Sequence, residues 1–143
     1  MSELSMSRTE RETFLAEIHV GVLSVERADG PPLVSPIWYR YVPGGIIEFN
    51  TESAAEKVRL MEACGRASLC IQREESPPAY VTVEGTVTIG PATDDVLLEI
   101  ATRYLGPDAA KGYLEVSNDD LTVALTPQRW RTVDFAKLQN TGS

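Results

Sequence analysis

The chain is poor in the residues that build metal centres and disulfide frameworks. Among its 143 residues it has one histidine, His19, and two cysteines, Cys64 and Cys70. One histidine cannot form a histidine-based zinc site unless carboxylates or thiolates join it, and the cysteines lack metal-motif spacing. We therefore interpret His19 as structural and predict no metal site. A Cys64–Cys70 disulfide is open on count alone, but two reduced thiols in the cytoplasm are the simplest interpretation.

Long apolar runs and common nucleotide or nucleophile motifs are missing as well. No stretch approaches the roughly 20 apolar residues of a membrane-spanning helix, and the polar start, MSELSMSRTERETF, has no apolar signal core. The sequence has no phosphate-binding P-loop, no G-x-S-x-G motif and no glycine-rich turn from strand to helix. We therefore expect a cytoplasmic protein with no membrane partner and no doubly wound parallel sheet.

Basic residues are outnumbered by acidic ones. The 13 Lys and Arg against 21 Asp and Glu give a formal net charge of -8. Such a surface repels nucleic acid and anionic membranes at long range, so neither is an expected partner. A local cationic pocket can still bind an anion, because short-range contacts outweigh a screened distant field. The length predicts one domain over residues 1–143, with a disordered tail at residues 1–6.

Alternation and helical spacing predict mainly β structure with helices between some strands. Helices are predicted from Ser7, over Ser53–Cys64, from Thr93 to Gly106 and over Asp108–Val116. Strands are predicted over His19–Glu26, Leu33–Val42, Ile46–Asn50, Ala67–Arg73, Tyr80–Ile89, Leu121–Leu125 and Arg129–Phe135. A tight turn joins the first two strands, which makes them antiparallel neighbours. The pattern favours an antiparallel barrel with attached helices.

Single residues refine this outline. Phe14, Leu15 and Ile18 have the spacing of a buried face on the first helix. Pro36 has no backbone N–H, so its position is expected at a sheet edge or a bulge. Gly85 stands where the alternation of its strand calls for an apolar side chain, which predicts a bend or a close backbone approach.

The segment GIIEFNTESAAEKVRL, residues 45–60, carries the strongest indication of a binding site. Ser53, with Glu56 three residues later, fits a capping box that begins a helix at Ser53. The first N–H groups of a helix lack intrahelical partners and lie at the positive end of its dipole. Together with the hydroxyls of Thr51 and Ser53 and the ammonium of Lys57, they would form a phosphate cradle. An ordinary capped helix with a solvated lysine is the alternative.

The order of several motifs resembles that of a known family. A first helix is followed by GVLSVERADGPPLVSPIWY, EFNTESAAEKVRL, RASLCI, YVTVEGTVTI and TPQRWRTVDF. This order resembles the FMN-binding split β-barrel superfamily, also called pyridoxamine-phosphate-oxidase-like, and within it the flavin- and deazaflavin-dependent oxidoreductases, many of which use coenzyme F-420. The resemblance covers about Phe14 to about Leu138. It implies a six-stranded antiparallel Greek-key split β-barrel, a homodimer, and two cofactor sites at the subunit interface.

The resemblance also implies which residues bind the cofactor. Family members hold the cofactor phosphate with a threonine at a strand end and a lysine six positions later, which Thr51 and Lys57 match. The segment SPIWY matches the strand along the isoalloxazine ring, and Trp130 matches a C-terminal aromatic near the partner's cofactor. The implied cofactor-binding residues are Ser35, Pro36, Ile37, Trp38, Asn50, Thr51, Ser53, Lys57 and Trp130.

Several assignments stay open at this level. Trp38 and Tyr39 point to opposite faces of one strand, so only one of them can face the cofactor. Trp130 could instead anchor the dimer interface. Ala55 and Glu56 stand where the oxidase proper has a serine and an arginine, which argues against pyridoxamine-phosphate oxidation. Losing that arginine from the FMN phosphate cluster favours F-420 over FMN.

The resemblance implies an oxidoreductase that uses F-420 or FMN to transfer a hydride to a small organic acceptor. The cofactor would carry the reaction while the protein binds and orients it, and no catalytic residue is assigned. The alternative is a carrier or sensor that binds a flavin or a haem product without turnover, or a stress protein built on the same dimer. We expect Arg73–Ala79 and Gly106–Asn118 to shape the substrate pocket.

Overall fold

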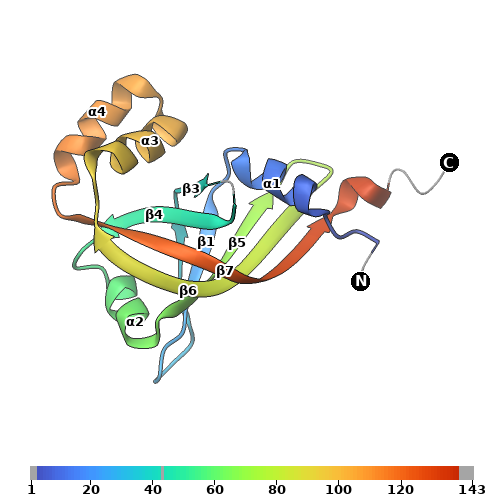
Figure 1. Ribbon diagram of the computed structural model, residues 1–143, viewed down its shortest axis with the longest axis horizontal. Helices are drawn as coiled ribbons and strands as arrows, with labels where there is room; N and C mark the ends of the chain where they lie inside the picture. Colours follow the sequence, from blue (N-terminus) through green and yellow to red (C-terminus); the bar gives the residue numbers. More distant parts are fainter. Residues whose placement is uncertain (1–2, 43, 139–143) are drawn as a thin grey trace.

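Seven antiparallel strands and four α-helices make up the part of the chain that the computed structural model describes, residues 3–42 and 44–138 (Figure 1). The helices are α1 (Arg8–Ala16), α2 (Glu56–Cys64), α3 (Asp94–Leu105) and α4 (Pro107–Val116), and a 3-10 turn, η1 (Phe135–Leu138), follows the last strand. The strands are β1 (Gly21–Val25), β2 (Leu33–Ile37), β3 (Tyr39–Val42), β4 (Ile46–Glu52), β5 (Arg66–Arg73), β6 (Ala79–Pro91) and β7 (Asp120–Asp134).

The seven strands form one sheet in the order β2-β1-β5-β6-β7-β4-β3, and every neighbouring pair is antiparallel. Its two edge strands, β2 and β3, are consecutive in the chain and separated by Trp38 alone. One residue spans only about 3.5 Å. The sheet therefore curls round until its two edges approach each other at Trp38, as a split barrel requires.

The mainly β, antiparallel architecture with helices is confirmed, but the expected count of six strands is wrong. The strand predicted over Leu33–Val42 passes from one edge of the sheet to the other at Trp38 and so counts as two. Conversely, the separate strands predicted over Leu121–Leu125 and Arg129–Phe135 are one continuous β7. Pro36 lies on the edge strand β2, as its missing N–H predicts.

The long β6–β7 pair bends at Gly85. The register shifts between Glu84 and Gly85, so that Gly85 pairs with Pro127 while Glu84 pairs with Arg129. A Cβ atom on Gly85 would lie 2.1 Å from the carbonyl oxygen of Thr126. The close backbone approach predicted at this glycine is confirmed, and the bulge accommodates a proline that can donate no hydrogen bond.

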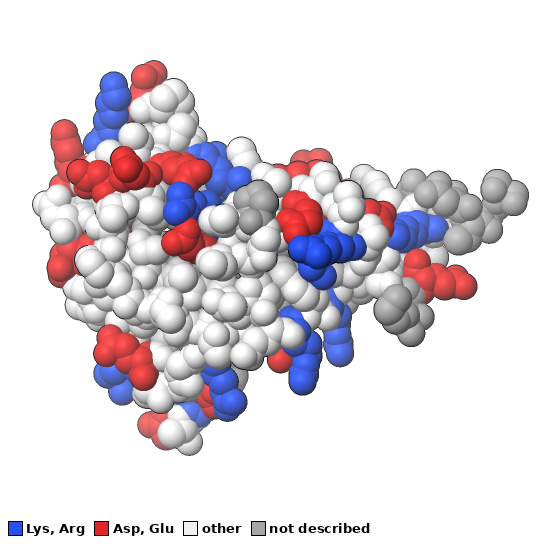
Figure 2. All heavy atoms as spheres, in the orientation of Figure 1, with Lys and Arg blue, Asp and Glu red and all other residues white. Residues whose placement is uncertain are grey.

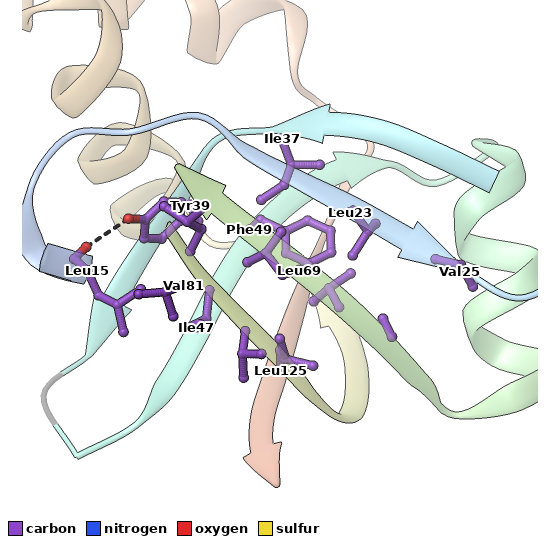
Figure 3. Packing of buried hydrophobic residues seen from close by; sticks show 14 of the residues in the cluster. Leu15, Leu23, Val25, Ile37, Tyr39, Ile47, Phe49, Leu69, Val81 and Leu125 are labelled. Carbon is purple, nitrogen blue, oxygen red and sulfur yellow. Dashed lines mark hydrogen bonds between the residues drawn. The ribbon is translucent and has the colours of Figure 1, made fainter. Parts of the chain in front are cut away.

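The core fills the inside of the curled sheet and is closed at one end by α1 (Figure 3). Tyr39 is fully buried there, and its hydroxyl donates a hydrogen bond of 2.8 Å to the carbonyl oxygen of Leu15. Burial raises the pKa of the Tyr39 hydroxyl, so it stays protonated. Phe14 and Leu15 are buried as expected, but Ile18 is 61% exposed because α1 ends at Ala16.

The termini of the helices follow the local sequence in most cases. Ser7 and Glu10 form the predicted capping box at the start of α1, and Thr93 caps α3. Gly65 ends α2 in the left-handed conformation, with φ 71°, as predicted. Among the described residues, no helix has the length and apolarity needed to cross a membrane.

The chain before α1 is attached to β7. The backbone N–H of Asp134 donates to the carbonyl oxygen of Leu4 at 2.8 Å, and that of Met6 donates to the hydroxyl of Thr132 at 2.8 Å. Of the tail predicted at residues 1–6, the part from Leu4 onward is therefore held against the sheet, and residues 1–2 lie outside the described residues. Cys64 and Cys70 are both free thiols.

Candidate functional site

Two adjoining hollows are lined by residues of α2, of the α3–α4 pair and of the ends of β4 and β7. In Figure 1 the α3–α4 pair and α2 lie on opposite sides of these strand ends. The large hollow has a volume of about 420 Å³ and is lined by Asn50, Thr51, Glu52, Ala55, Lys57, Tyr113, Val116, Ser117 and Asp120. The small hollow has a volume of about 270 Å³ and is lined by Pro36, Ile37, Trp38, Asn50, Lys57, Ile100 and Tyr113. Asn50, Lys57 and Tyr113 line both, so one ligand could extend from one hollow into the other.

Most of the residues implied as cofactor ligands come together here. Asn50 and Thr51 come from β4 and Lys57 from the first turn of α2. Pro36 and Ile37 come from the end of β2, and Trp38 is the residue between β2 and β3. Ser35 lines neither hollow; its hydroxyl oxygen is buried and has no hydrogen-bond partner among the described residues.

Lys57 is the cation of both hollows. Its side chain is half-buried, and burial lowers the pKa of the ammonium, which the nearby Glu52 carboxylate only partly offsets. In the described part of the chain, Lys57 forms no ion pair. A desolvated charge without a partner costs free energy, and an anionic ligand would offset that cost.

Asn50 supplies a hydrogen-bond donor beside this ammonium. Its side-chain oxygen accepts a bond of 2.6 Å from the Thr122 hydroxyl, which fixes the orientation of the amide. The Nδ2 atom is buried and has no partner within residues 3–42 and 44–138. Buried amide donors are almost always satisfied in native proteins. Asn50, which lines both hollows, therefore has an unused donor among the described residues.

The capping box predicted at Ser53 is wrong. The helix begins at Glu56, with Ala55 as its N-cap and no side-chain cap. The Ser53 hydroxyl instead donates to the Asp119 carboxylate, and its backbone N–H donates to the Asp119 carbonyl oxygen at 3.3 Å. Glu56 pairs with Arg59 on the same helix. The Ser53 hydroxyl therefore binds Asp119, which is distant in sequence, and does not cap the helix. Ser53 lines neither hollow.

The positive end of the α2 dipole nevertheless lies at the large hollow. Ala55, the N-cap of α2, lines this hollow next to Lys57. The unpaired N–H groups of a first helical turn favour anions. Of the groups expected to form a phosphate cradle, Thr51, Lys57 and the start of α2 line this hollow, and Ser53 does not. Phosphate binding by them stays a prediction.

In the lining of the large hollow, two carboxyl groups stand against the single ammonium of Lys57. Glu52 and Asp120 are directly opposite each other on β4 and β7, and both line it. Burial raises the pKa of Asp120, and the charges of Glu52 and Asp119 raise it further. Figure 2 shows further acidic side chains gathered around the α3–α4 pair. The sequence reasoning did not identify Asp120, because its position across from Glu52 follows only from the strand register.

An aromatic stack forms one wall of the small hollow. The Trp38 ring lies parallel to that of Tyr104, with 5.1 Å between centroids and 8° between planes, and it is tilted against Tyr113 at 5.9 Å. The Tyr104 hydroxyl donates to the carbonyl oxygen of His19 at 2.6 Å and accepts from the N–H of Tyr39 at 3.2 Å. Of the two neighbouring aromatics, Trp38 therefore lines a hollow and Tyr39 belongs to the core.

Trp130 lies in another part of the protomer. It is on β7 opposite the buried Val83 and packs against the hydrophobic core, and the guanidinium of Arg11 lies 4.1 Å from its ring centroid. It also lines a separate hollow with other residues of β6 and β7. It does not line either hollow at Lys57. Its placement near a partner's cofactor stays a prediction.

The arrangement can bind a molecule with an anionic end and a flat apolar end. The ammonium and amide of the large hollow suit oxygen acceptors, and the wall of Ile37, Trp38 and Ile100 suits an apolar ring. Among the described residues, no group of three His, Cys, Asp or Glu side chains could hold a metal ion.

Comparisons with known proteins identify the family and the fold of the chain. The sequence profile of the pyridoxamine 5'-phosphate oxidase family matches residues 7–134. No curated protein sequence matches the chain significantly. Among solved structures, a conserved hypothetical protein from Mycobacterium tuberculosis superposes with a TM-score of 0.84 at 24% identity, over 97% of this chain and 91% of that one.

Two further structures indicate the range of functions on this fold. An F-420 reductase superposes with a TM-score of 0.70 at 25% identity, over 84% of this chain and 94% of that one. A haem storage protein from Vibrio cholerae superposes with a TM-score of 0.68 at 18% identity, over 89% of this chain and 94% of that one. Identity of 18% shows a common fold and nothing more about function.

Proposed function

Because the chain belongs to the pyridoxamine 5'-phosphate oxidase family, we propose that it binds a flavin-type cofactor, F-420 or FMN, in the two hollows and uses it to transfer a hydride to a small organic acceptor. The observation that carries this proposal is the half-buried Lys57, which has no ion pair among the described residues and shares the walls of both hollows with Asn50, whose Nδ2 atom has no partner among those residues. Both residues line hollows of a size that suits a ligand.

The large hollow would hold the anionic end of the cofactor. Lys57 would pair with a phosphate oxygen, Thr51 lies next to it on the hollow wall, and the first turn of α2 contributes its dipole. Asn50 would donate to an oxygen between the anionic end and the ring. Ser53 has no part in this arrangement, since its hydroxyl is bonded to Asp119.

The small hollow would hold the ring system. Trp38 and Ile37 give an apolar wall, and Pro36 leaves no unpaired N–H at the sheet edge. When bound, the cofactor supplies the hydride chemistry, and the protein supplies orientation and a shielded site.

F-420 is the cofactor we favour. Glu56, which stands where a phosphate-binding arginine is expected for FMN in the oxidase proper, pairs with Arg59, and the hollow already contains two carboxylates, Glu52 and Asp120. The similarity to an F-420 reductase at 25% identity supports the same choice. Because a deazaflavin reacts poorly with oxygen, we expect no oxidase activity.

A homodimer is part of the proposal. Val22, Val34 and Pro36 point to the same outer face of β1 and β2 and are exposed. Adjacent exposed apolar side chains on a sheet are typical of an interaction surface. In such a dimer, Trp130 of the partner subunit would approach the cofactor, as the family resemblance implies.

Titration of the purified protein with F-420 and with FMN, followed by ligand fluorescence, tests the proposal. We expect saturable binding of at least one cofactor, and reduction of an acceptor when the reduced cofactor is supplied. Binding with no turnover across a broad acceptor panel would support the alternative, a carrier or sensor. The absence of binding by either cofactor would contradict the proposal.

A further inference from the structure

The hollows have one shared wall residue that the family resemblance does not assign. Tyr113, on α4, lines both hollows together with Asn50 and Lys57. It comes from the α3–α4 pair, which is inserted between β6 and β7 and lies above the end of β4 (Figure 1). Tyr113 thus stands at the boundary between the space for an anionic group and the space for a ring.

Packing holds Tyr113 in this place. Its ring is tilted by 39° against Trp38, and Trp38 is itself stacked on Tyr104. Tyr104 is attached to the barrel by hydrogen bonds to His19 and Tyr39. The three rings therefore connect the α3–α4 pair to the strand ends.

The hydroxyl of Tyr113 is available for a ligand. The hydroxyls of Tyr39 and Tyr104 each donate to a backbone carbonyl. Within residues 3–42 and 44–138, Tyr113 takes part in a side-chain hydrogen bond only through its backbone carbonyl, which accepts from the Ser117 hydroxyl at 2.9 Å. Its side chain is partly exposed and lines both hollows. A tyrosine hydroxyl can both donate and accept, which suits the alcohol groups of a sugar-like chain.

We propose that Tyr113 is a specificity residue that binds the middle of the ligand. Its hydroxyl hydrogen-bonds the polyol chain that joins the ring to the anionic group, while its ring packs against the ring system beside Trp38. FMN and F-420 have this polyol chain in common, so the inference does not depend on which of them binds. It does rest on the proposed function, because it requires a ligand that spans both hollows.

Truncated ligands test each part of the contact separately. The probes are FMN, riboflavin, which lacks the phosphate, and lumiflavin, which lacks the polyol chain. The matching deazaflavins are F-420, a form that keeps the ring and the polyol chain but lacks the phosphate, and a form in which a methyl group replaces the polyol chain on the ring. Affinities are measured by fluorescence titration for the wild type and for Tyr113→Phe, with Tyr41→Phe as a control hydroxyl outside both hollows.

The expected pattern is selective. Tyr113→Phe should weaken both polyol-containing ligands by about three- to tenfold, the range for one neutral hydrogen bond. It should leave the ring-only ligand unchanged, and Tyr41→Phe should change none. Tyr113→Ala should also weaken the ring-only ligand, whereas Leu114→Ala, at a position lining neither hollow, should not.

Two results would overturn the inference while leaving the proposed function standing. One is a Tyr113→Phe variant that binds riboflavin or its deazaflavin counterpart as the wild type does. The other is an equal loss for all three ligands of a series, which would indicate a change in the fold. If the wild type binds none of the six probes, the proposed function fails and this inference fails with it. Circular dichroism of each variant separates folding from binding.

Discussion

Single carboxyl groups affect the charge of the large hollow, and Asp120 is the example with a shifted pKa. Its pKa is raised, first by burial and then by Glu52 and Asp119. When the pKa of a carboxyl is higher in the folded state than in the unfolded state, its contribution to the free energy of unfolding is fully present below the unfolded-state pKa. This contribution is lost as the pH rises through the folded-state pKa. We therefore expect Asp120→Asn to be at least as stable as the wild type at neutral pH, measured by urea unfolding.

The same substitution should change ligand binding. Removing a negative charge from the wall that holds Lys57 should strengthen binding of the phosphate-bearing cofactor. Riboflavin or the phosphate-free deazaflavin, having no anion there, should be affected less. Asp95→Asn, on the exposed first turn of α3, is the control. An equal change for both ligands, or none, would argue against an anion in the large hollow.

The charge of Lys57 also predicts a pH dependence. Because burial lowers its folded pKa below the usual lysine value, the ammonium should deprotonate at a lower alkaline pH than an exposed lysine. Phosphate-bearing ligands should bind less well above that folded pKa, and the fold should gain stability between the folded and unfolded pKa values. In Lys57→Arg, which keeps its charge, the alkaline loss of binding should disappear. Ligand titrations at increasing pH measure the change in binding, and urea unfolding at the same pH values measures the change in stability.

Among the secondary structure elements, the β6–β7 pair depends on one glycine. In Gly85→Ala the new Cβ would meet a backbone carbonyl oxygen at 2.1 Å, and backbone cannot move aside as a flexible side chain can. We expect a loss of about 2 kcal/mol or more in the free energy of unfolding. Gly90→Ala, later in the same strand, has nothing within 4 Å of the new Cβ and should change stability by less than about 0.5 kcal/mol. Equal stabilities of the two variants in urea would contradict the close approach.

Local signals predicted those elements whose partners are close in sequence. The Ser7–Glu10 capping box and the glycine that ends α2 depend on neighbours within one turn, and both are present. Ser53 does not cap α2 because its hydroxyl donates a hydrogen bond to Asp119, which is distant in sequence. Trp38 divides one predicted strand into two because the curvature of the whole sheet decides where a strand changes edge.

The candidate site also combines residues that the sequence indicates with residues that only the fold brings together. Thr51, Lys57 and Trp38 were indicated by their resemblance to a family pattern, and they do line the hollows. Tyr113 and Asp120 follow Lys57 by more than fifty residues in the sequence, and no motif around them indicates a binding site. Of the two segments expected to shape a substrate pocket, Gly106–Asn118 contributes wall residues to the hollows, whereas Arg73–Ala79 contributes none. That either segment shapes a substrate pocket stays a prediction.

At the scale of the whole molecule, the proposed dimer makes a separate prediction. We expect light scattering to give twice the mass of one 15.7 kDa chain. Val34→Glu should weaken association, because it places a charge on the exposed apolar face of β1 and β2. Leu98→Glu, on an exposed position of α3, is the control. A monomeric wild type that still binds cofactor would contradict the interface placement.

The net charge of -8 makes the anion contact at Lys57 the central claim, because the protein as a whole repels the ligand that this site would bind. The most direct measurement is the affinity of the wild type and of Lys57→Ala for a phosphate-bearing cofactor and for its phosphate-free form, with Arg59→Ala on the same helix as the control. We predict a loss of about 1.5–3 kcal/mol for the phosphate-bearing ligand and little change for the other. Equal affinities of a folded Lys57→Ala variant and the wild type for both ligands would contradict the account.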